Sequence, residues 1–319
     1  LVKDADIIHL HWINQGFLSL KDIEELVKLN KPIVWTMHDM WPCTGICHHA
    51  RDCEKFQMIC ESCFFLKSKG KDLSTSVFDK KLSLYKEANI TFVGCSRWLS
   101  GKAKKSYLLR DKTVLSIPNP IDTEVYHPMD QDMTRELLGL PSGKRLLLFG
   151  ALNVTDKRKG IDYLIEDLRK IEKQDVELVV FGQAKDDIRG LFPVPIHSMG
   201  YLSDESKIVA LYNAVDMFIT SSLEENLPNT IMESMACGTP CVGFEIGGIP
   251  EMIDHKINGY VASYKDASDL ANGIRWVLEH EDQQALSDAC VKKVQENYTE
   301  EVVAKQYMAL YKRLLHQKK

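Results

Sequence analysis

Two glutamates separated by seven residues, Glu225 and Glu233, stand in the segment SSLEENLPNTIMESMACGTPCV, residues 221–242. The apolar run Met217–Thr220 before them predicts a buried strand of a parallel sheet, and apolar residues at helical spacing follow Pro228. Glu225 is therefore expected in a loop at the carboxyl edge of a strand, where open α/β sheets bind ligands, and Glu233 on the next helix. Carboxylates at such an edge can accept hydrogen bonds from a hydroxyl-rich ligand. The competing interpretation is that acidic residues near a helix start only favour the helix dipole.

The start of that helix is a candidate phosphate site. Pro228 suits the first helical position, with Asn226 or Leu227 as the cap. Asn229 and Thr230 then fall in the first turn, where backbone N–H groups have no partners within the helix. Such N–H groups bind anions, so the segment predicts a ligand that carries both phosphate and hydroxyl groups.

Length and composition indicate a globular protein with two domains. The chain has 319 residues, of which 45% are hydrophobic and 27% are charged, and these are ordinary values for a globular protein. The sequence shows neither an apolar run of about 18 residues, as a transmembrane helix needs, nor a signal peptide. We therefore expect a cytoplasmic location. Because the chain begins at Leu1, inside what reads as continuing structure, we expect it to lack its natural N-terminus.

The net charge of −5 is unevenly distributed. Residues 1–121 hold 18 basic and 13 acidic side chains, whereas the remainder holds 22 and 32. Clusters of lysine occur at Lys67, Lys69, Lys71, Lys80 and Lys81, and at Lys102, Lys104 and Lys105. They form either solvated helix faces or a surface that meets anionic lipid or a lipid-phosphate acceptor. Nucleic acid is not an expected partner, because the chain is acidic overall and has no recognition motif.

Strands and helices are predicted to alternate along both halves of the chain. The expected strands of the first half are Ala5–Leu10, Pro32–Met37, Ile90–Cys95 and Thr113–Ile117, and those of the second half are 145–150, 176–181, 216–220, 240–244 and 260–263. Between the halves, Pro118-Asn119-Pro120 favours an extended connection and is the best candidate for a domain boundary. This alternation predicts two α/β domains with doubly wound parallel sheets.

A cysteine-rich loop is expected at about residues 40–66. Cys47, Cys53, Cys60 and Cys63 follow the spacing C-x5-C-x6-C-x2-C, and histidines 48 and 49 lie beside them. The four thiolates, or three of them with one imidazole, suit a structural zinc ion. Two alternatives stay open: disulfides, which a cytosolic location disfavours, and thiols that pack as small apolar side chains.

Together these segments resemble the GT-B-fold retaining glycosyltransferases of family 4, also called glycosyl transferases group 1, of the bacterial polysaccharide-synthesis type. The matching motifs are Glu225-x7-Glu233 with its continuation ESMACGTPCV, Gly247-Gly248-Ile249-Pro250-Glu251 followed by Asn258-Gly259, Lys159-Gly160, the segment IPNPID at 117–122, the segment WTMHD at 35–39, and NYTEEVVAKQYMALYKRLL near the C-terminus. They occur in the family's order over almost the whole chain. Two departures are visible: the family's first strand and its glycine-rich loop are absent, and Ala151 stands where the family usually has arginine.

The resemblance implies two Rossmann-like domains that face each other across a cleft, the N-terminal one incomplete. It implies an acceptor-side domain at 1–121, a donor-binding domain at 122–298, and a C-terminal helix at 299–319 that crosses back to the first domain. Glu225 and His38 would then be catalytic, although His38 at a strand end also suits a core histidine. The donor would be bound by Lys159, Arg158, Gly160, Asn229, Thr230 and Glu233, with Lys159 on the diphosphate and Glu233 on the ribose.

The acceptor side is less sharply defined. His9 and His11 share one face of their strand, and they are either structural or line the acceptor cleft. Ser96 either caps a helix or contacts the acceptor.

The resemblance also implies an activity. A sugar would move from a nucleotide-sugar donor to a saccharide or lipid-linked acceptor, in the synthesis of cell-surface polysaccharide such as lipopolysaccharide or capsule. Catalysis would need no cofactor, and the protein would contact the cytoplasmic face of the inner membrane peripherally. The alternative is a truncated, non-catalytic remnant that binds nucleotide but transfers no sugar.

Overall fold

The computed structural model describes residues 2–171, 176–183 and 188–316, and the chain divides into two compact units. Unit 1 comprises Leu1–Pro118 and Ala304–Lys319, and unit 2 comprises Asn119–Val303. These limits differ by a few residues from the predicted boundaries at 121 and 298. The physical reason is a short parallel bridge between Ile121 and Thr299, which keeps both connecting segments in unit 2.

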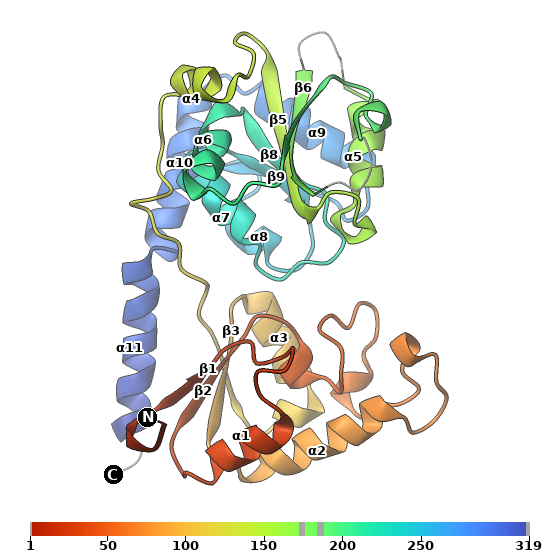
Figure 1. Ribbon diagram of the computed structural model, residues 1–319, viewed down its shortest axis with the longest axis vertical. Coiled ribbons are helices and arrows are strands. Elements are labelled where there is room, and N and C mark those ends of the chain that lie inside the picture. Colours follow the sequence, from red (N-terminus) through yellow and green to blue (C-terminus); the bar gives the residue numbers. More distant parts are fainter. Residues whose placement is uncertain (1, 172–175, 184–187, 317–319) are drawn as a thin grey trace. The chain divides into compact units, whose positions relative to one another are not determined.

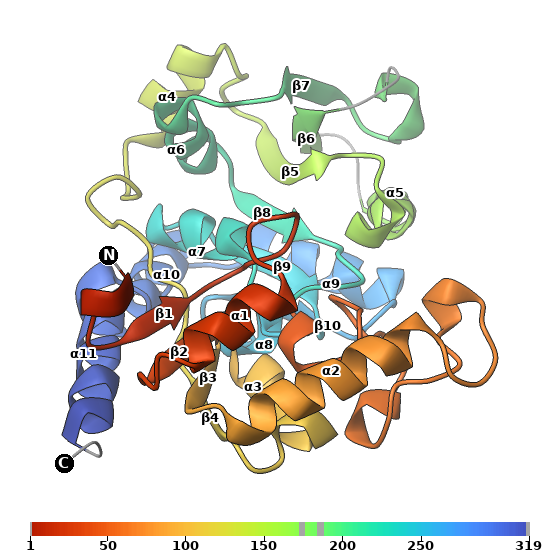
Figure 2. The same ribbon diagram turned by 60° about the horizontal axis from the view of Figure 1, so that its bottom comes forward.

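Unit 1 is built on a parallel sheet (Figures 1 and 2). Within the described residues its strands are β1 (Ile8–Leu10), β2 (Ile33–Met37), β3 (Ile90–Gly94) and β4 (Thr113–Ser116), in the spatial order β1-β2-β3-β4. Its helices are α1 (Leu20–Val27), α2 (Leu73–Glu87), α3 (Arg97–Lys105) and the part of α11 (Glu300–His316) that begins at Ala304. Every residue of β2 and β3 is buried, as expected for central strands covered on both faces.

Unit 2 contains a larger parallel sheet. Its strands are β5 (Arg145–Asn153), β6 (Val176–Gln183), β7 (Ile196–Gly200), β8 (Met217–Thr220), β9 (Cys241–Phe244) and β10 (Gly259–Ala262), in the order β10-β9-β8-β5-β6-β7. Read from β5, this is the 3-2-1-4-5-6 order of dinucleotide-binding sheets. The chain builds outward from β5 to β7 and then returns to the other side of β5 with β8. Strands β5 and β8 therefore define a switch point, and ligands of such sheets bind at the carboxyl ends of those two strands.

The helices of unit 2 are α4 (Gln131–Leu138), α5 (Ile161–Leu168), α6 (Glu205–Ala214), α7 (Asn229–Ala236), α8 (Ile249–Met252), α9 (Ala267–Leu278) and α10 (Gln283–Asn297). The short 3-10 turns of both units lie at Val2–Asp4, Trp41–Cys43, Lys55–Gln57, Phe64–Leu66, Tyr107–Leu109, Lys157–Lys159 and Arg189–Leu191. Helix α7 begins one residue later than predicted, because Pro228 has an extended ψ of 117° and is the cap rather than the first helical residue.

The sequence did not predict β7, α4 or α8. Strand β7 is an edge strand whose residues are half-buried or exposed, and it includes the polar residues His197 and Ser198. Helix α4 reads as polar because two of its inward positions are Thr134 and Arg135. Helix α8 has only four residues, which is too few for a periodic pattern.

Lys81 is not part of a surface cluster, contrary to the prediction. It lies on α2 and is fully buried. Its ammonium donates to the carbonyls of Trp41 at 2.6 Å, Thr44 at 3.0 Å and Gly45 at 3.1 Å, and lies 3.4 Å from the centre of the Trp41 ring. Burial lowers the pKa of Lys81 to about 7. This lysine therefore holds the start of the cysteine-rich loop against α2.

None of the helices within the described ranges is both long enough and apolar enough to span a membrane.

Candidate active site

An ion pair joins two predicted site residues at the switch point of unit 2. The turn Lys157–Lys159 follows β5, and the loop that contains Glu225 follows β8. Lys159 Nζ donates to Glu225 Oε1 at 2.6 Å, and both side chains are half-buried. Residues 66 positions apart thus meet where this sheet order binds its ligand.

Close backbone contact holds these two loops together. The Leu223 N–H donates to the Arg158 carbonyl at 2.7 Å, and the Ser221 hydroxyl donates to the Lys159 carbonyl at 2.9 Å. Gly160 has a φ of +66°, and a Cβ on it would overlap the carbonyl oxygen of Ser221. Glycine is therefore required here for both its conformation and its lack of a side chain.

The second glycine segment supports Glu225 from its other side. Gly247 has a φ of +60°, and a Cβ on it would overlap the Glu225 carbonyl oxygen. The Gly248 N–H donates to the Asn226 carbonyl. The Gly-Gly pair thus fixes the backbone at Glu225, while the Lys159 turn fixes the loop before it.

Glu233 lies on α7 and makes a different contact. The hydroxyl of buried Tyr212 donates to Glu233 Oε2 at 2.9 Å. Burial raises the pKa of Glu233, against the opposing effect of this hydrogen bond. Tyr212 is a site neighbour that the sequence analysis missed, because a tyrosine inside an apolar helix pattern carries no separate signal.

The remaining donor-side candidates are more exposed. Arg158 forms an ion pair with Asp156, its Nη2 lying 2.7 Å from Oδ2. Asn229 is exposed in the first turn of α7 and accepts a hydrogen bond from Asn119 Nδ2 at 3.3 Å, and Thr230 is half-buried beside it.

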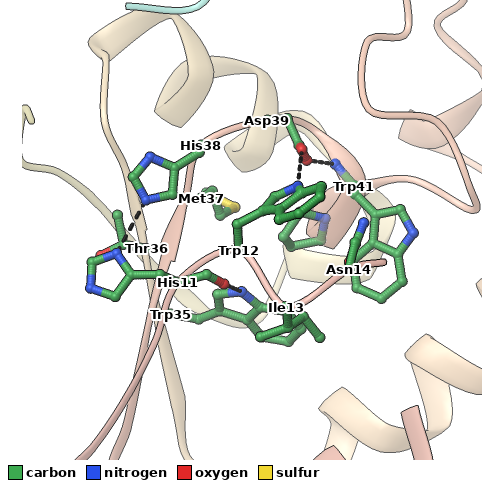
Figure 3. A pocket seen from close by; sticks show the side chains of 11 residues that line it. His11, Trp12, Ile13, Asn14, Trp35, Thr36, Met37, His38, Asp39 and Trp41 are labelled. Carbon is green, nitrogen blue, oxygen red and sulfur yellow. Dashed lines mark hydrogen bonds between the residues drawn. The ribbon is translucent and has the colours of Figure 1, made fainter. Parts of the chain in front are cut away.

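In unit 1, two histidines meet at the ends of neighbouring strands. His11 follows β1, His38 follows β2, and His11 Nδ1 lies 3.1 Å from His38 Nε2 (Figure 3). Burial lowers the pKa of both rings, and the neighbouring His11 adds to the effect on His38. The pair is therefore neutral near pH 7, with one ring donating to the other.

His9 takes no part in that pair. Its Nε2 lies 2.8 Å from Thr36 Oγ1, and its Nδ1 lies 2.6 Å from the Tyr311 hydroxyl of α11. Burial, with the nearby His11 and His38, lowers the pKa of His9 to about 4. Thus His9 is structural and anchors α11 along the edge strand β1 (Figures 1 and 2), and His11 differs by reaching His38.

Ser96 caps a helix, which was one of its two predicted roles. Buried Ser96 is the N-cap of α3, with its hydroxyl accepting from the Leu99 N–H at 2.9 Å.

The four spaced cysteines share one hollow with about 330 Å³ of empty space; its lining includes Cys47, Cys53, Cys60, Cys63, Phe64 and Phe65. No disulfide joins any cysteine, and all the cysteines lie in the described part of the chain. Burial raises the pKa of Cys47, and that of Cys60 to about 11. Among residues 2–171, 176–183 and 188–316, no three His, Cys, Asp or Glu side chains gather into a group that could hold a metal ion. The zinc assignment stays a prediction.

Comparison with known proteins agrees with the geometry of unit 2. Residues 143–280 match the family model described as glycosyl transferases group 1. This segment runs from just before β5 to just after α9, so it includes both loops of the Lys159–Glu225 pair. Residues 143–280 are thus similar to a glycosyl transferases group 1 domain.

Individual relatives share a quarter to a third of their residues with this chain over the aligned segments. N-acetyl-alpha-D-glucosaminyl L-malate synthase of Bacillus anthracis is 25% identical over 207 residues, which cover 63% of this chain and 54% of that enzyme. The chain therefore spans about half the length of this relative. A second relative, from Campylobacter jejuni, is N,N'-diacetylbacillosaminyl-diphospho-undecaprenol alpha-1,3-N-acetylgalactosaminyltransferase. It is 32% identical over 121 residues, which cover 36% of this chain and 31% of that enzyme.

A solved structure shows the fold. The Anabaena protein HepE, crystallised with UDP and glucose, matches with a TM-score of 0.69 and 16% identity, over 98% of this chain and 79% of that one. The predicted α/β class is confirmed, and the fold is GT-B, with one parallel sheet in each unit.

Proposed function

We propose that this chain is a retaining glycosyltransferase of family 4 that moves a sugar from a nucleotide-sugar donor to a saccharide or lipid-linked acceptor. The observation that carries the proposal is the Lys159–Glu225 pair at the switch point of a group 1 domain. The similarity to HepE, which binds UDP and glucose, supports a nucleotide-sugar donor in unit 2.

In this proposal the diphosphate binds between the Lys159 turn and the start of α7. The Lys159 ammonium supplies positive charge, and Arg158 supplies more at the exposed side of the turn. The N–H groups at Asn229 and Thr230 add donors without a metal ion or other cofactor. Because Lys159 is bonded to Glu225 in the present structure, an arriving diphosphate competes with Glu225 for the ammonium.

The two glutamates take different parts of the donor. Glu233, half-buried and bonded to Tyr212, accepts from the ribose hydroxyls. Glu225 accepts from hydroxyls of the transferred sugar and stabilises the positive charge that develops at its anomeric carbon.

Retention follows a front-face route. The bond from the anomeric carbon to the phosphate oxygen breaks with its electron pair on that oxygen. The acceptor oxygen bonds to the same carbon, and its proton passes to the departing phosphate oxygen. His38 contacts the sugar or the acceptor in this step.

The biological setting is proposed to be the synthesis of cell-surface polysaccharide, such as lipopolysaccharide or capsule, on the cytoplasmic side of the membrane. The Campylobacter relative, whose name includes an undecaprenol-linked diphosphate, supports a lipid-linked acceptor. The second candidate is a non-catalytic nucleotide-binding remnant, which the confinement of the family match to unit 2 favours.

Loss of the Lys159 charge is expected to weaken the binding of a nucleoside diphosphate. In calorimetric titrations with UDP, GDP and ADP, Lys159→Ala should bind the preferred nucleotide at least about tenfold more weakly, since an ion-assisted hydrogen bond contributes about 1.5–3 kcal/mol. The matched control is Lys157→Ala, an exposed lysine of the same turn, which should keep its affinity. Equal losses in both variants would contradict the donor-site assignment.

Sugar transfer by the parent chain and by Glu225→Gln tests whether the protein is an enzyme or a non-catalytic remnant. Glu225→Gln should leave nucleotide affinity within a few-fold of the parent but reduce sugar transfer to a lipid-linked acceptor by about 10²–10³-fold, as loss of a charge-stabilising group does. A parent chain that binds nucleotide yet transfers no sugar would favour the remnant.

A surface of the cysteine-rich loop supports the proposed peripheral membrane contact. In the segment FFLKSKGK, Phe64, Phe65 and Leu66 are 52%, 45% and 39% exposed. Lys67, Lys69 and Lys71 follow and are all exposed. We call residues 64–71 the apolar–basic loop. Apolar side chains can enter the headgroup region while neighbouring lysines meet anionic lipid.

Co-sedimentation with phosphatidylcholine vesicles that contain phosphatidylglycerol tests this contact. Replacing the three lysines of the apolar–basic loop by Gln should weaken vesicle binding by about 100-fold, at about 1 kcal/mol per lysine. Replacing Lys102, Lys104 and Lys105 by Gln removes the same charge from α3 and should have little effect. If both triple variants lose binding equally, a general charge effect is indicated; if the parent does not bind, the contact is wrong.

A further inference from the structure

An aromatic hollow in unit 1 lies at the carboxyl ends of neighbouring strands. Trp12 and Asn14 reach it from the segment after β1, and Asp39 and Trp41 from the segment after β2 (Figure 3). The hollow has about 190 Å³ of empty space, continuous with the surface.

Asp39 is fixed by three donors from three parts of the chain. Trp12 Nε1 donates to its Oδ2 at 2.9 Å, the Trp41 N–H donates to its Oδ1 at 2.8 Å, and His48 Nδ1 lies 2.7 Å from Oδ2. Burial alone would raise the pKa of Asp39, but the hydrogen bonds from His48 and the Trp41 backbone hold it below its usual value. Asp39 is thus a charged carboxylate that only accepts.

This carboxylate decides which nitrogen of His48 carries a proton. Because Asp39 only accepts, His48 carries a proton on Nδ1. The amide nitrogen of Asn14 lies 3.3 Å from Nε2, and the His48 side chain is 44% exposed. Because an amide nitrogen only donates, Nε2 accepts from Asn14, and the ring therefore orients the Asn14 carboxamide at the surface.

The indole of Trp12 is oriented by the same carboxylate. Its N–H is bonded to Asp39 Oδ2, yet the residue is 43% exposed. What remains open to a ligand is therefore apolar ring surface, held in one orientation. A ring face beside a small set of planar polar groups is suited to a sugar, whose C–H face is apolar and whose edges carry hydroxyls.

We propose that Trp12, Asn14 and His48 form a subsite for a pyranose ring of the acceptor, with the ring on the Trp12 face and hydroxyls bonded to the Asn14 carboxamide, which His48 orients. Asp39 is a positioning residue, since it acts through Trp12 and His48. This inference rests on the proposed transferase function and names the acceptor class as a hydroxyl-rich hexose unit.

A purely structural role does not account for the arrangement. The Met40 N–H already donates to the His48 carbonyl at 2.8 Å, so the backbone ties this part of the loop down without the side chain. The exposed Trp12 face adds nothing to that tie.

Saturation-transfer NMR of the full chain with a mixture of D-glucose, D-galactose, D-mannose and N-acetyl-D-glucosamine tests the subsite. We expect at least one sugar to receive saturation in the parent protein. Trp12→Ala and His48→Gln should reduce that signal at least fivefold. Trp12→Phe keeps an aromatic face but not the N–H, and it should retain most of the signal.

The donor half of the chain supplies the control. Lys159→Ala impairs the proposed donor site, so it should keep the unit 1 sugar signal. The inference is overturned if no sugar receives saturation, if Trp12→Ala leaves the signal unchanged, or if Lys159→Ala alone removes it.

Failure of the proposed function can be distinguished from failure of the subsite, because it would appear as an absence of nucleotide binding in calorimetry. Trp12→Phe and Asn14→Ala disturb unit 1 less than Trp12→Ala does. A near-ultraviolet circular dichroism spectrum that matches the parent's shows that a variant is still folded, so a loss of sugar binding in it is a loss of the subsite. In transfer assays, His48→Gln should raise the KM for the acceptor more than it lowers kcat, a split that a merely structural role would not produce.

Discussion

Gly160→Ala is expected to abolish measurable nucleotide binding at micromolar protein concentration. A Cβ at this position would overlap the carbonyl oxygen of Ser221, a backbone atom that cannot rotate aside. The loop after β8 must then separate from the Lys159 turn, and the hydrogen bonds from Leu223 to Arg158 and from Ser221 to Lys159 are lost. Lys159 and Glu225 no longer meet, so the proposed diphosphate site is lost with its geometry. Calorimetry with the preferred nucleotide measures this directly.

Gly139 provides a closely matched control. Its φ and ψ of +65° and 29° are nearly those of Gly160, +66° and 30°, but a Cβ there has nothing within 4 Å. Gly139→Ala therefore has the left-handed strain, about 1–2 kcal/mol, without the overlap. It should lose some stability and keep nucleotide affinity. If both variants bind equally well, the contact between the two loops does not control the site.

Lys81→Met is expected to destabilise unit 1 by at least about 2 kcal/mol, since each buried acceptor left without its donor costs about 1–3 kcal/mol. The substitution leaves the buried carbonyls of Thr44 and Gly45 without their donor and removes the ammonium from the face of Trp41. Urea unfolding followed by tryptophan fluorescence measures the effect, because Trp276 is the one tryptophan of the sequence that lies in unit 2.

The neighbouring residue supplies the comparison. Lys80 is exposed on the same helix, so Lys80→Met should change the unfolding free energy by less than about 0.5 kcal/mol. Equal effects at the two positions would show that the buried ammonium contributes little.

Lys81 is also expected to make the unfolding free energy depend on pH. The pKa of Lys81 is lowered to about 7 in the folded protein, against about 10.4 for an unfolded lysine. Between these values the unfolded chain binds more protons, so this residue makes the unfolding free energy rise with pH across that window. Lys81→Met should remove this part of the slope, and an unchanged slope would contradict the assignment.

Much of the fold was readable from local patterns. The strands β2, β3, β8 and β9 are short apolar runs bounded by turn residues, and such runs have few alternatives to a buried parallel strand. Edge strand β7 lacked this signal because its residues are half-buried or exposed. Lys81 was read as a surface charge, although it lies in the helical stripe of Phe78 and Tyr85, both buried. Position in that stripe, rather than charge, was the better guide.

The candidate site was only partly readable. Glu225, Glu233 and Lys159 could be placed on loops and a helix start by their spacing and by the resemblance. Trp12 and Asp39 were not singled out as site residues, because a tryptophan after a strand has a common structural explanation. His48 was considered only as an imidazole beside the cysteines, for a structural zinc ion. Their shared carboxylate contact becomes visible only in three dimensions.

The sequence by itself determined the α/β class, the position of most strands and the presence of a glutamate pair beside a helix start. These features depend on periodicity and on neighbours within a few residues, which one chain displays directly. The tertiary structure decided that Lys159 meets Glu225, that His11 rather than His9 pairs with His38, and that His48 is oriented by Asp39. Each of these pairs depends on strand order and on how closely loops approach, and these distances arise only when the sheets assemble.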